Sequence, residues 1–255
     1  MDLGLNGRVA LVAAASRGLG KAVATALAEE GARVAMFARR QEAIEAAAAE
    51  VRRRSGAEVL PLEADVNRPE DLERVVKATV DRFGRLDVLI NNAGGPPPGT
   101  FDTLTEEQWQ QAVNLTLMSA VRLTRLALPH LRTQGGGRII NLTSSSTREP
   151  IPNLMLSNAH RISMINAFKT IARQVAADGV TLNTVLPGRI DTDRLIELLG
   201  SHEAAQALAA EEVPAGRLGT VEEFAAIAVL LCSARAGYVT GETVAVDGGL
   251  LRSVF

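Results

Sequence analysis

The sequence of 255 residues contains one cysteine, one tyrosine and one tryptophan, and aromatic residues make up only 3% of the chain. A single cysteine, Cys232, cannot form an internal disulfide, and the sequence around it lacks the spacing of metal ligands. We therefore expect Cys232 to be a small apolar residue late in a helix. The formal net charge of −2 is also small, so the composition favours no nucleic-acid partner.

Long apolar runs are missing as well. The chain enters a strand-like segment at Arg8 without the basic start and apolar core of a signal peptide. No uninterrupted apolar run approaches the roughly 20 residues that cross a bilayer. We therefore expect a cytoplasmic protein with no membrane contact. The Asn-x-Thr sequences at Asn114 and Asn141 are then chance matches rather than glycosylation sites.

What the chain does contain is a regular alternation of short β-rich runs and longer runs rich in Ala, Leu, Glu and Arg. Gly31 is typical of the residue that ends a helix in a left-handed conformation, and Pro69 suits a first helical turn. The pattern predicts strands at 8–14, 33–38, 58–62, 87–90, 138–142, 180–186 and 243–246, and helices at 19–30, 41–54, 69–83, 106–132, 153–177 and 221–232.

Seven strands separated by helices indicate parallel pairing through right-handed crossovers. The first strand, which reads VALVA over 9–13, is apolar throughout, as expected where helices cover both faces of a sheet. We therefore predict one α/β domain of residues 1–255, a Rossmann fold with a doubly wound seven-stranded parallel sheet. A polar stretch at about 189–219, helical over 191–212, is predicted to form a substrate lid.

The turn after the first strand carries glycines at a place where doubly wound sheets bind ligands, beyond the carboxyl ends of the strands. It reads AAASRGLG over residues 13–20, with Gly18 and Gly20 at the start of the next helix. Glycine lets the backbone approach a pyrophosphate, and the helix N-terminus favours the negative charge of that group. The turn therefore predicts a dinucleotide site.

The second strand ends without the acid that an NAD site usually presents to the ribose hydroxyls. Ala38 is followed by Arg39 and Arg40, and Arg17 lies in the first turn. Guanidinium groups at these places suit a 2′-phosphate, so we expect NADP(H) rather than NAD(H). The alternative is that these arginines only solvate a helix start, in a chain with 24 arginines and three lysines.

Further landmarks follow in order along nearly the whole chain. They are Asp65-Val66, Asn91-Asn92-Ala93-Gly94, Asn114, Ser144, Pro187-Gly188 with Thr192, Val239-Thr240-Gly241 and Val246-Asp247-Gly248-Gly249. With the Gly-rich turn, they resemble the short-chain dehydrogenase/reductases, and especially the 3-oxoacyl-[acyl-carrier-protein] reductase type.

The resemblance implies a cofactor site that spans the edge of the sheet. Asp65 and Val66 would contact the adenine, and the segment from Pro187 to Thr192 would hold the nicotinamide carboxamide. Ala14 stands where the family has the first glycine of its turn. Because alanine tolerates ordinary backbone angles, we expect weakened rather than abolished binding. The predicted cofactor-binding residues are Ala14, Ser16, Arg17, Gly18, Leu19, Gly20, Arg39, Asp65, Val66, Asn92, Ala93, Gly94, Pro187, Gly188, Ile190 and Thr192.

The resemblance also implies hydride transfer between a nicotinamide and a small carbonyl or alcohol substrate. Ser144 fits the family's substrate-orienting serine, but its Tyr-x-x-x-Lys pair falls on Ser157 and Arg161. Residues four apart share a helix face, so these two side chains point where the pair would have pointed. A serine is a far weaker acid than a phenol, and an arginine stays protonated. The candidate catalytic residues are Asn114, Ser144, Ser157 and Arg161.

Three interpretations follow from this altered pair. The chain is a reductase whose proton comes from elsewhere, either from water held by Asn114 or from His160. Alternatively, it binds NADP(H) without turnover, as a sensor or an inactive partner subunit. In the third interpretation it is a scaffold with a vestigial site. The only tyrosine, Tyr238, lies near the last strand and replaces neither residue.

Two further expectations concern partners. The predicted helices at 105–132 and 153–177 carry more apolar positions than one sheet surface needs, and in the resembling family these helices form the dimer interface. We predict a homotetramer, with a dimer as the second choice. Arg148, Arg189 and Arg194 are candidates to meet an anionic substrate, although a solvated surface position is the favoured reading for each.

Overall fold

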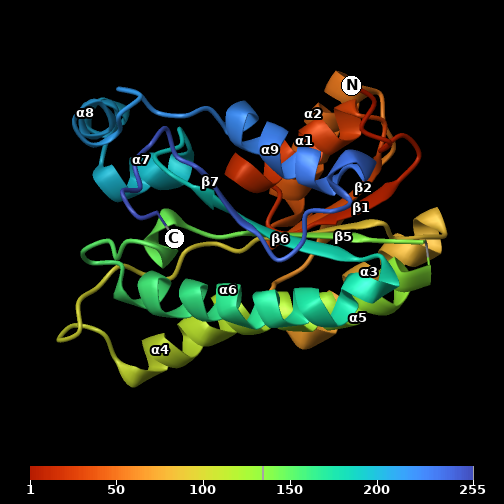
Figure 1. Ribbon diagram of the computed structural model, residues 1–255, viewed down its shortest axis with the longest axis horizontal. Helices are drawn as coiled ribbons and strands as arrows, with labels where there is room; N and C mark the ends of the chain where they lie inside the picture. Colours follow the sequence, from red (N-terminus) through yellow and green to blue (C-terminus); the bar gives the residue numbers. More distant parts are fainter. Residues whose placement is uncertain (134, 255) are drawn as a thin grey trace.

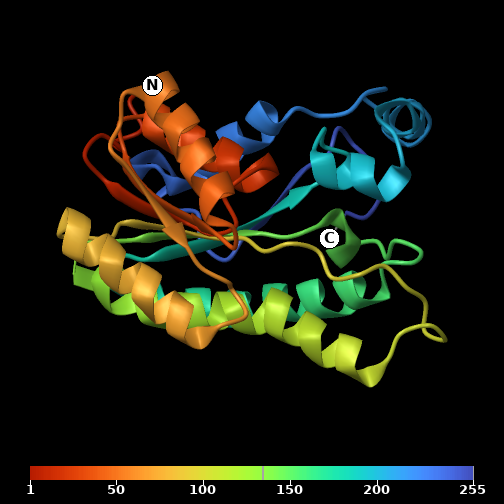
Figure 2. The same cartoon turned by 180° about the vertical axis from the view of Figure 1, so that it is seen from behind.

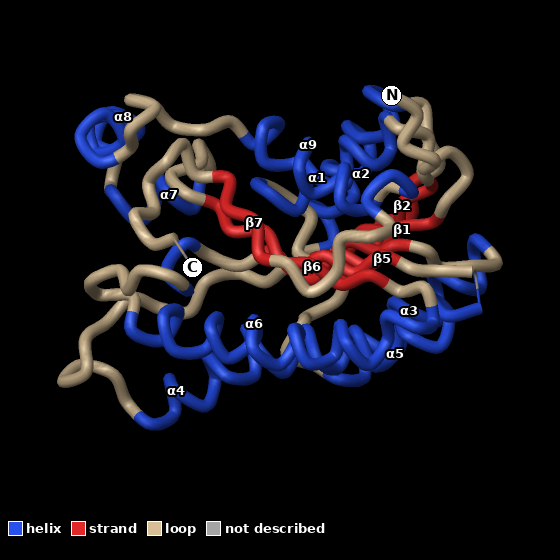
Figure 3. The backbone as a smooth tube through the Cα atoms, in the orientation of Figure 1, coloured by secondary structure: helices blue, strands red, loops and turns tan. Residues whose placement is uncertain are grey.

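The computed structural model describes residues 1–133 and 135–254, so Gln134 and Phe255 of the predicted domain lie outside the described residues. One sheet of parallel strands runs through the molecule in the order β3-β2-β1-β4-β5-β6-β7, which confirms the predicted doubly wound architecture (Figure 1; Figure 3). The strands are β1 (Val9–Val12), β2 (Arg33–Ala38), β3 (Val59–Glu63), β4 (Val88–Asn91), β5 (Arg138–Leu142), β6 (Thr181–Pro187) and β7 (Thr243–Val246).

Helices cover both faces of this sheet. α1 (Gly18–Glu29), α2 (Gln41–Ser55) and α9 (Val221–Cys232) lie on one face. The other face is covered by α3 (Pro69–Phe83), α5 (Ser119–Thr133) and α6 (Met155–Val175), as Figure 2 shows from behind. The remaining α-helices are α4 (Glu106–Val113), α7 (Asp193–Leu199) and α8 (His202–Glu212).

The burial of β1 shows why its sequence is apolar at every position. Ala10 and Val12 pack in the core beneath α1, α2 and α9, while Val9 and Leu11 pack in the core on the other face. All four residues are buried. Successive side chains of a strand point to opposite faces, so a strand covered on both sides needs apolar residues throughout.

Two predicted helices are broken in the structure. The segment 106–132 is not one regular helix, because a π-helical turn at Asn114–Met118 separates α4 from α5. The predicted helical stretch 191–212 is two helices, α7 and α8. Gly200 ends α7 with a φ of +91°, and the hydroxyl of Ser201 then accepts a hydrogen bond from the Ala204 N–H and caps α8.

The carboxyl ends of the strands lie on one side of the molecule, and α7 and α8 lie at that same side (Figure 1). The segments that follow β4 and β5 also gather there. Parallel pairing therefore brings turns from distant parts of the sequence to one edge, as the general rule for open α/β sheets requires. None of the helices in 1–133 and 135–254 has the length and apolar character of a membrane span.

Candidate functional site

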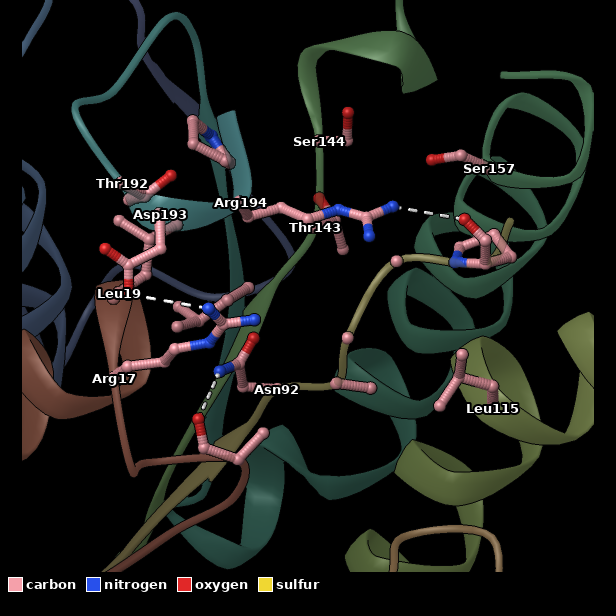
Figure 4. Close-up of a pocket in the computed structure, with 18 of the residues that line it drawn as sticks. Arg17, Leu19, Asn92, Leu115, Thr143, Ser144, Ser157, Thr192, Asp193 and Arg194 are labelled. Carbon is pink, nitrogen blue, oxygen red and sulfur yellow. Dashed lines mark hydrogen bonds and ion pairs between the residues drawn. The ribbon is translucent and has the colours of Figure 1, made fainter. Parts of the chain in front are cut away.

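A cavity of about 1050 Å³ opens at the carboxyl edge of the sheet (Figure 4). Its walls come from the turn after β1, the ends of β2 and β3, the segments after β4 and β5, the start of α6, and α7. Every predicted cofactor residue except Gly20 lines this cavity, as do Ser144, Ser157 and Arg161. Residues that are far apart in the sequence thus meet in one place.

The turn after β1 brings the backbone of the α1 N-terminus close to the end of β4. A Cβ atom at Gly20 would lie 2.5 Å from the carbonyl oxygen of Ala14 and 2.8 Å from Nδ2 of Asn92. Asn92 donates a hydrogen bond from Nδ2 to that same carbonyl, at 3.3 Å. Gly20 is therefore required for close packing of the turn rather than for contact with the cavity.

Ala14 differs from its prediction. Its φ is +49°, so it adopts the left-handed region instead of ordinary backbone angles. The assumption of ordinary backbone angles was wrong, because the turn holds this residue at a positive φ, and the expectation of weakened cofactor binding stays a prediction. A non-glycine residue in this region costs about 1–2 kcal/mol relative to right-handed backbone. The turn keeps its shape at the expense of some stability.

The first turn of α1 has the features of a phosphate site. Its N-cap, Arg17, has an extended backbone and no side-chain hydrogen bond to the helix, and the first turn contains no acidic residue. The free N–H groups and the helix dipole therefore favour an anion there. Arg39 and Arg40, at the end of β2, line the same part of the cavity. These residues fit the phosphates of NADP.

Arg17 is held by two acidic residues of α7. Its Nη1 lies 2.6 Å from Oε1 of Glu197 and 3.5 Å from Oδ2 of Asp193, both in α7 (Figure 4). The hydrogen bond to Glu197 raises the pKa of Arg17, against a smaller effect of burial, and Arg17 in turn lowers the pKa of Glu197. The side chains of Arg17 and Glu197 are about half exposed, at 55% and 52%, so a bound phosphate can compete for Arg17.

The other end of the cavity is built on β6 and the chain that follows it. A Cβ atom at Gly188 would lie 2.5 Å from Cα of Asp247, so only glycine allows the C-terminal segment to pack here. Thr192 caps α7 by accepting a hydrogen bond from the Leu195 N–H. Its methyl group lies 3.8 Å from the Cβ position of Gly18, which places the lid directly against the Gly-rich turn.

Four hydroxyl groups gather above the end of β5. Ser144 Oγ accepts a hydrogen bond from the Ser146 N–H at 3.1 Å, and Ser146 Oγ lies 3.4 Å from Ser157 Oγ. In Figure 4 the hydroxyl of Ser157 points from its helix toward the segment that carries Ser144. Thr143 Oγ1 is buried with no hydrogen-bond partner in the described part of the chain. Ser144 and Ser157 line the cavity, so their hydroxyl groups are placed to hold a polar atom of a bound molecule.

Arg161 lies one helical turn after Ser157 and is buried, with 8% of the residue exposed. Its Nη1 donates to the carbonyl oxygen of Leu142 at 3.4 Å. Burial, with a smaller effect of the nearby Arg194 charge, lowers the pKa of Arg161 well below its ordinary value, to about 10. Its guanidinium therefore remains a cation at neutral pH, in agreement with the expectation that it does not move protons.

Asn114 and His160 are placed less favourably as sources of a proton. Asn114 accepts a hydrogen bond from Arg122 at 3.3 Å and borders a separate hollow of about 480 Å³. His160 is buried with its ring edge-on to Trp109, at a centroid distance of 5.4 Å, and burial lowers its pKa. Neither lines the main cavity. The geometry thus favours a structural role for His160 over a role as proton donor.

Two residues of the cavity go beyond the sequence predictions. Arg194 was expected to be a solvated surface residue, and Thr143 was not among the predicted site residues. Arg194 lies in the first turn of α7. Its guanidinium extends across the cavity and donates a hydrogen bond to the carbonyl oxygen of Pro96 at 3.2 Å (Figure 4). A signal for Thr143 was available in its position beside Ser144, at the carboxyl end of a parallel strand. No comparable signal existed for Arg194, because its direction depends on how α7 packs.

The described residues do not support a metal site or a reactive thiol. No group of three or more His, Cys, Asp or Glu side chains within 1–133 and 135–254 could hold a metal ion. Cys232 is buried in α9, as predicted, and burial raises the pKa of its thiol. The cavity beside α7 is therefore the candidate site.

Comparisons with known proteins agree with this geometry. Residues 13–251 match the family model described as enoyl-(acyl carrier protein) reductase. The chain is 39% identical over 250 residues to the 3-oxoacyl-[acyl-carrier-protein] reductase FabG of Vibrio cholerae, covering 97% of this chain and 99% of the relative. It is 33% identical to dehydrogenase/reductase SDR family member 4 of Sus scrofa, over 96% of this chain and 88% of that protein.

Solved structures are similar over the whole fold. L-sorbose reductase from Gluconobacter frateurii, crystallised with NADPH and L-sorbose, superimposes with a TM-score of 0.94 at 35% identity, covering 100% of both chains. YwfH, an NADPH-dependent reductase involved in bacilysin biosynthesis, gives a TM-score of 0.92 at 31% identity, covering 97% of this chain and 99% of that one. Sequence and structure therefore point to the same group of proteins.

Proposed function

This chain belongs to the short-chain dehydrogenase/reductase family, and from that membership and its cavity we propose that it is an NADP(H)-dependent oxidoreductase acting on a carbonyl or alcohol substrate. The observation that carries the proposal is a single cavity of about 1050 Å³ that combines two groups of residues. A phosphate-binding turn lies at one end, and hydroxyl groups with a buried cation lie at the other.

The preference for NADP(H) rests on charge. Arg17, Arg39 and Arg40 surround the part of the cavity at the ends of β1 and β2, where the adenosine ribose is expected. The 2′-phosphate distinguishes NADP from NAD, and guanidinium groups bind phosphate through paired, charge-assisted hydrogen bonds. The similar L-sorbose reductase and YwfH are described with NADPH, which supports the same choice here.

The substrate half of the cavity gives each residue a role in the proposal. When bound, NADPH supplies a hydride to the carbonyl carbon of the substrate. Ser144 and Ser157 donate hydrogen bonds to the carbonyl oxygen, and the cationic Arg161 stabilises the negative charge that develops on it. Solvent water provides the proton. Ser157 and Arg161 thus replace a Tyr/Lys pair by electrostatic stabilisation rather than by a dedicated acid.

The second candidate is an NADP(H)-binding protein without turnover, either a sensor or an inactive partner subunit. The observation in its favour is that the described part of the cavity wall contains no phenol or imidazole, and its acids lie away from Ser144 and Ser157, with Asp193 and Glu197 paired to Arg17. Both candidates share the cofactor site, so they differ only in whether hydride leaves the nicotinamide.

Isotope transfer separates the two candidates. The protein is incubated with NADPH carrying deuterium on the transferable position, together with L-sorbose, a 3-oxoacyl thioester and simple ketones, and the alcohols are analysed by mass spectrometry. We expect a deuterated alcohol from at least one carbonyl, and about 100-fold less of it with Ser144→Ala. The control is Ser163→Ala, an exposed serine of α6 that does not line the cavity. Bound NADPH with no deuterated product would favour the sensor.

A homotetramer, a cytoplasmic location and closure of the 189–219 lid also belong to the proposal. β7 is at one end of the sheet, and the neighbouring Tyr238 is fully exposed. On α6, Ile162 is 38% exposed, although it is a large apolar residue. Contact between copies would cover these groups. Sedimentation at micromolar concentration should give a tetramer, and a monomer alone would contradict the assembly.

A further inference from the structure

Arg161 is a buried cation without a counter-ion. No carboxylate in 1–133 or 135–254 lies within 4.0 Å of its guanidinium, and the one hydrogen bond that the structure shows for it, to the Leu142 carbonyl, is long at 3.4 Å. A charge removed from water is costly unless an opposite charge or several hydrogen bonds compensate for it. The residue also lines the cavity, so a ligand can provide the missing partner.

Arg194 adds a second cation to the same space. It belongs to α7, is an exposed residue, and donates a hydrogen bond across the cavity to the Pro96 carbonyl oxygen at 3.2 Å. Its charge is close enough to contribute, after burial, to the lowered pKa of Arg161. Two like charges that face one cavity repel each other, and this repulsion is relieved by an anion between them.

The acidic residues that line the cavity do not act as counter-ions for Arg161 and Arg194. Glu197 and Asp193 lie against Arg17, although Glu197 also experiences a weaker effect of the Arg194 charge. Asp65 lies at the end of β3, on the adenosine side, where its Oδ1 accepts hydrogen bonds from Asn67. The excess positive charge is therefore localised beside Ser144 and Ser157.

We propose that the substrate is an oxo acid, whose carboxylate binds between Arg161 and Arg194 while Ser144 and Ser157 hold its carbonyl group. The inference rests on the proposed function for the chemistry at the carbonyl. The carbonyl carbon accepts a hydride from NADPH, the π electrons move to the oxygen, and that oxygen takes one proton from water. The products are a hydroxy acid and NADP⁺, and the carboxylate is unchanged.

The cofactor does not account for these two cations. Its phosphates belong at the N-terminus of α1 and beside Arg17 and Arg39, at the other end of the cavity. The carboxamide expected next to Pro187 is neutral. A carboxylate, by contrast, accepts paired hydrogen bonds from a guanidinium in a planar arrangement, which is the strongest match available to an arginine.

Binding of matched probes tests the inference. The probes are benzoylformate and benzoylacetate, each compared with its methyl ester, which keeps the ketone and ring but removes the charge. Calorimetry gives Kd for each probe with the cofactor-free and NADPH-loaded protein, and NADPH oxidation gives kcat/KM. We expect one of the acids to bind at least tenfold more tightly than its ester.

Arg194→Gln should remove this preference. It should raise the Kd of the acid about tenfold or more and leave the Kd of the ester and of NADPH unchanged. Arg194 is exposed, so the variant should fold. Arg217→Gln is the control, because this lid arginine pairs with Glu223 outside the cavity and should keep the preference. Arg194→Lys should retain part of it.

The outcomes separate the inference from the proposed function. Equal binding of acid and ester, or a preference that survives Arg194→Gln, overturns the oxo-acid inference even if a neutral ketone is reduced. If NADPH does not bind, the proposed function fails. An acid preference that disappears with Arg194→Gln in the cofactor-free protein still supports an anion site between the two arginines.

Discussion

Arg17 and Arg161 line the same cavity but differ in exposure and in their partners. The Arg17 side chain is 55% exposed and forms ion pairs with two acids of α7. Arg161 is 8% exposed and has a single long hydrogen bond to a backbone carbonyl. An exposed, paired cation has little effect on the free energy of folding and exchanges partners easily. A buried, unpaired cation makes the folded state less stable.

This contrast separates the two halves of the site. The adenosine half follows the pattern of dinucleotide folds, with a Gly-rich turn, a free helix N-terminus and exposed cations. The described lining of the substrate half contains no tyrosine and concentrates hydroxyl groups and positive charge. Under the proposed function, cofactor binding and proton supply therefore depend on different residues, and variants can alter them one at a time.

The largest expected effect comes from restoring an acid in the substrate half. Ser157→Tyr with Arg161→Lys should raise the turnover of neutral ketones about 100-fold, because a positioned general acid contributes that much or more. The change is measured as kcat for NADPH oxidation. The matched control is Ser157→Phe with Arg161→Lys, which supplies the ring without the hydroxyl. Equal activity of the two variants would mean that the phenol does not reach the carbonyl.

In the adenosine half, Arg17→Gln should weaken NADPH binding about 10- to 100-fold and leave NADH binding nearly unchanged. The reason is the loss of a charge-assisted hydrogen bond to the 2′-phosphate. Nicotinamide fluorescence gives both Kd values, with Arg217→Gln as the control on an arginine outside the cavity. Equal losses for both cofactors would place Arg17 on the pyrophosphate instead.

Replacement of the buried cation should increase stability. Arg161→Met is expected to raise the free energy of unfolding by about 1–3 kcal/mol, because it removes an uncompensated charge. The comparison is Arg138→Met, since Arg138 is also partly buried but donates hydrogen bonds to the carbonyls of Ser233 and Gly137 at 3.2 and 3.0 Å. That substitution should destabilise the protein in the same denaturant titration.

The pH dependence of this effect has a definite sign. Burial lowers the pKa of Arg161 to about 10 in the folded protein, below its ordinary value in the unfolded chain, so above about pH 10 the unfolded chain binds more protons than the folded one. The cost of burying the charge is therefore fully present below about pH 10 and declines above it. The gain in the free energy of unfolding from Arg161→Met should therefore be constant from pH 6 to 9. An advantage that grows with alkaline pH would contradict the assignment.

The smallest effect concerns the turn itself. Ala14→Gly should stabilise the protein by about 1 kcal/mol, because glycine adopts a φ of +49° without the Cβ conflict. The gain is offset in part by the larger entropy of glycine in the unfolded chain. Thermal unfolding of the variant and the wild type measures the difference. A loss of stability would show that the turn relaxes around alanine.

The sequence predicted the features that arise from local patterns and strand order. All seven strands were expected, because each is a short β-rich run between helical segments, and the carboxyl edge followed from parallel pairing. The features that it did not predict depend on packing between distant segments. The π-turn at Asn114–Met118, the positive φ of Ala14 and the reach of Arg194 across the cavity are examples.

Titration of the purified protein with NADPH and with NADH, by nicotinamide fluorescence and calorimetry, tests the central claim most directly. The adenosine half is proposed to be intact and selective, so NADPH should bind at one site per chain and at least tenfold more tightly than NADH. Equal affinities would remove the role given to Arg17 and Arg39. If neither cofactor binds, the cavity is vestigial and the account is contradicted.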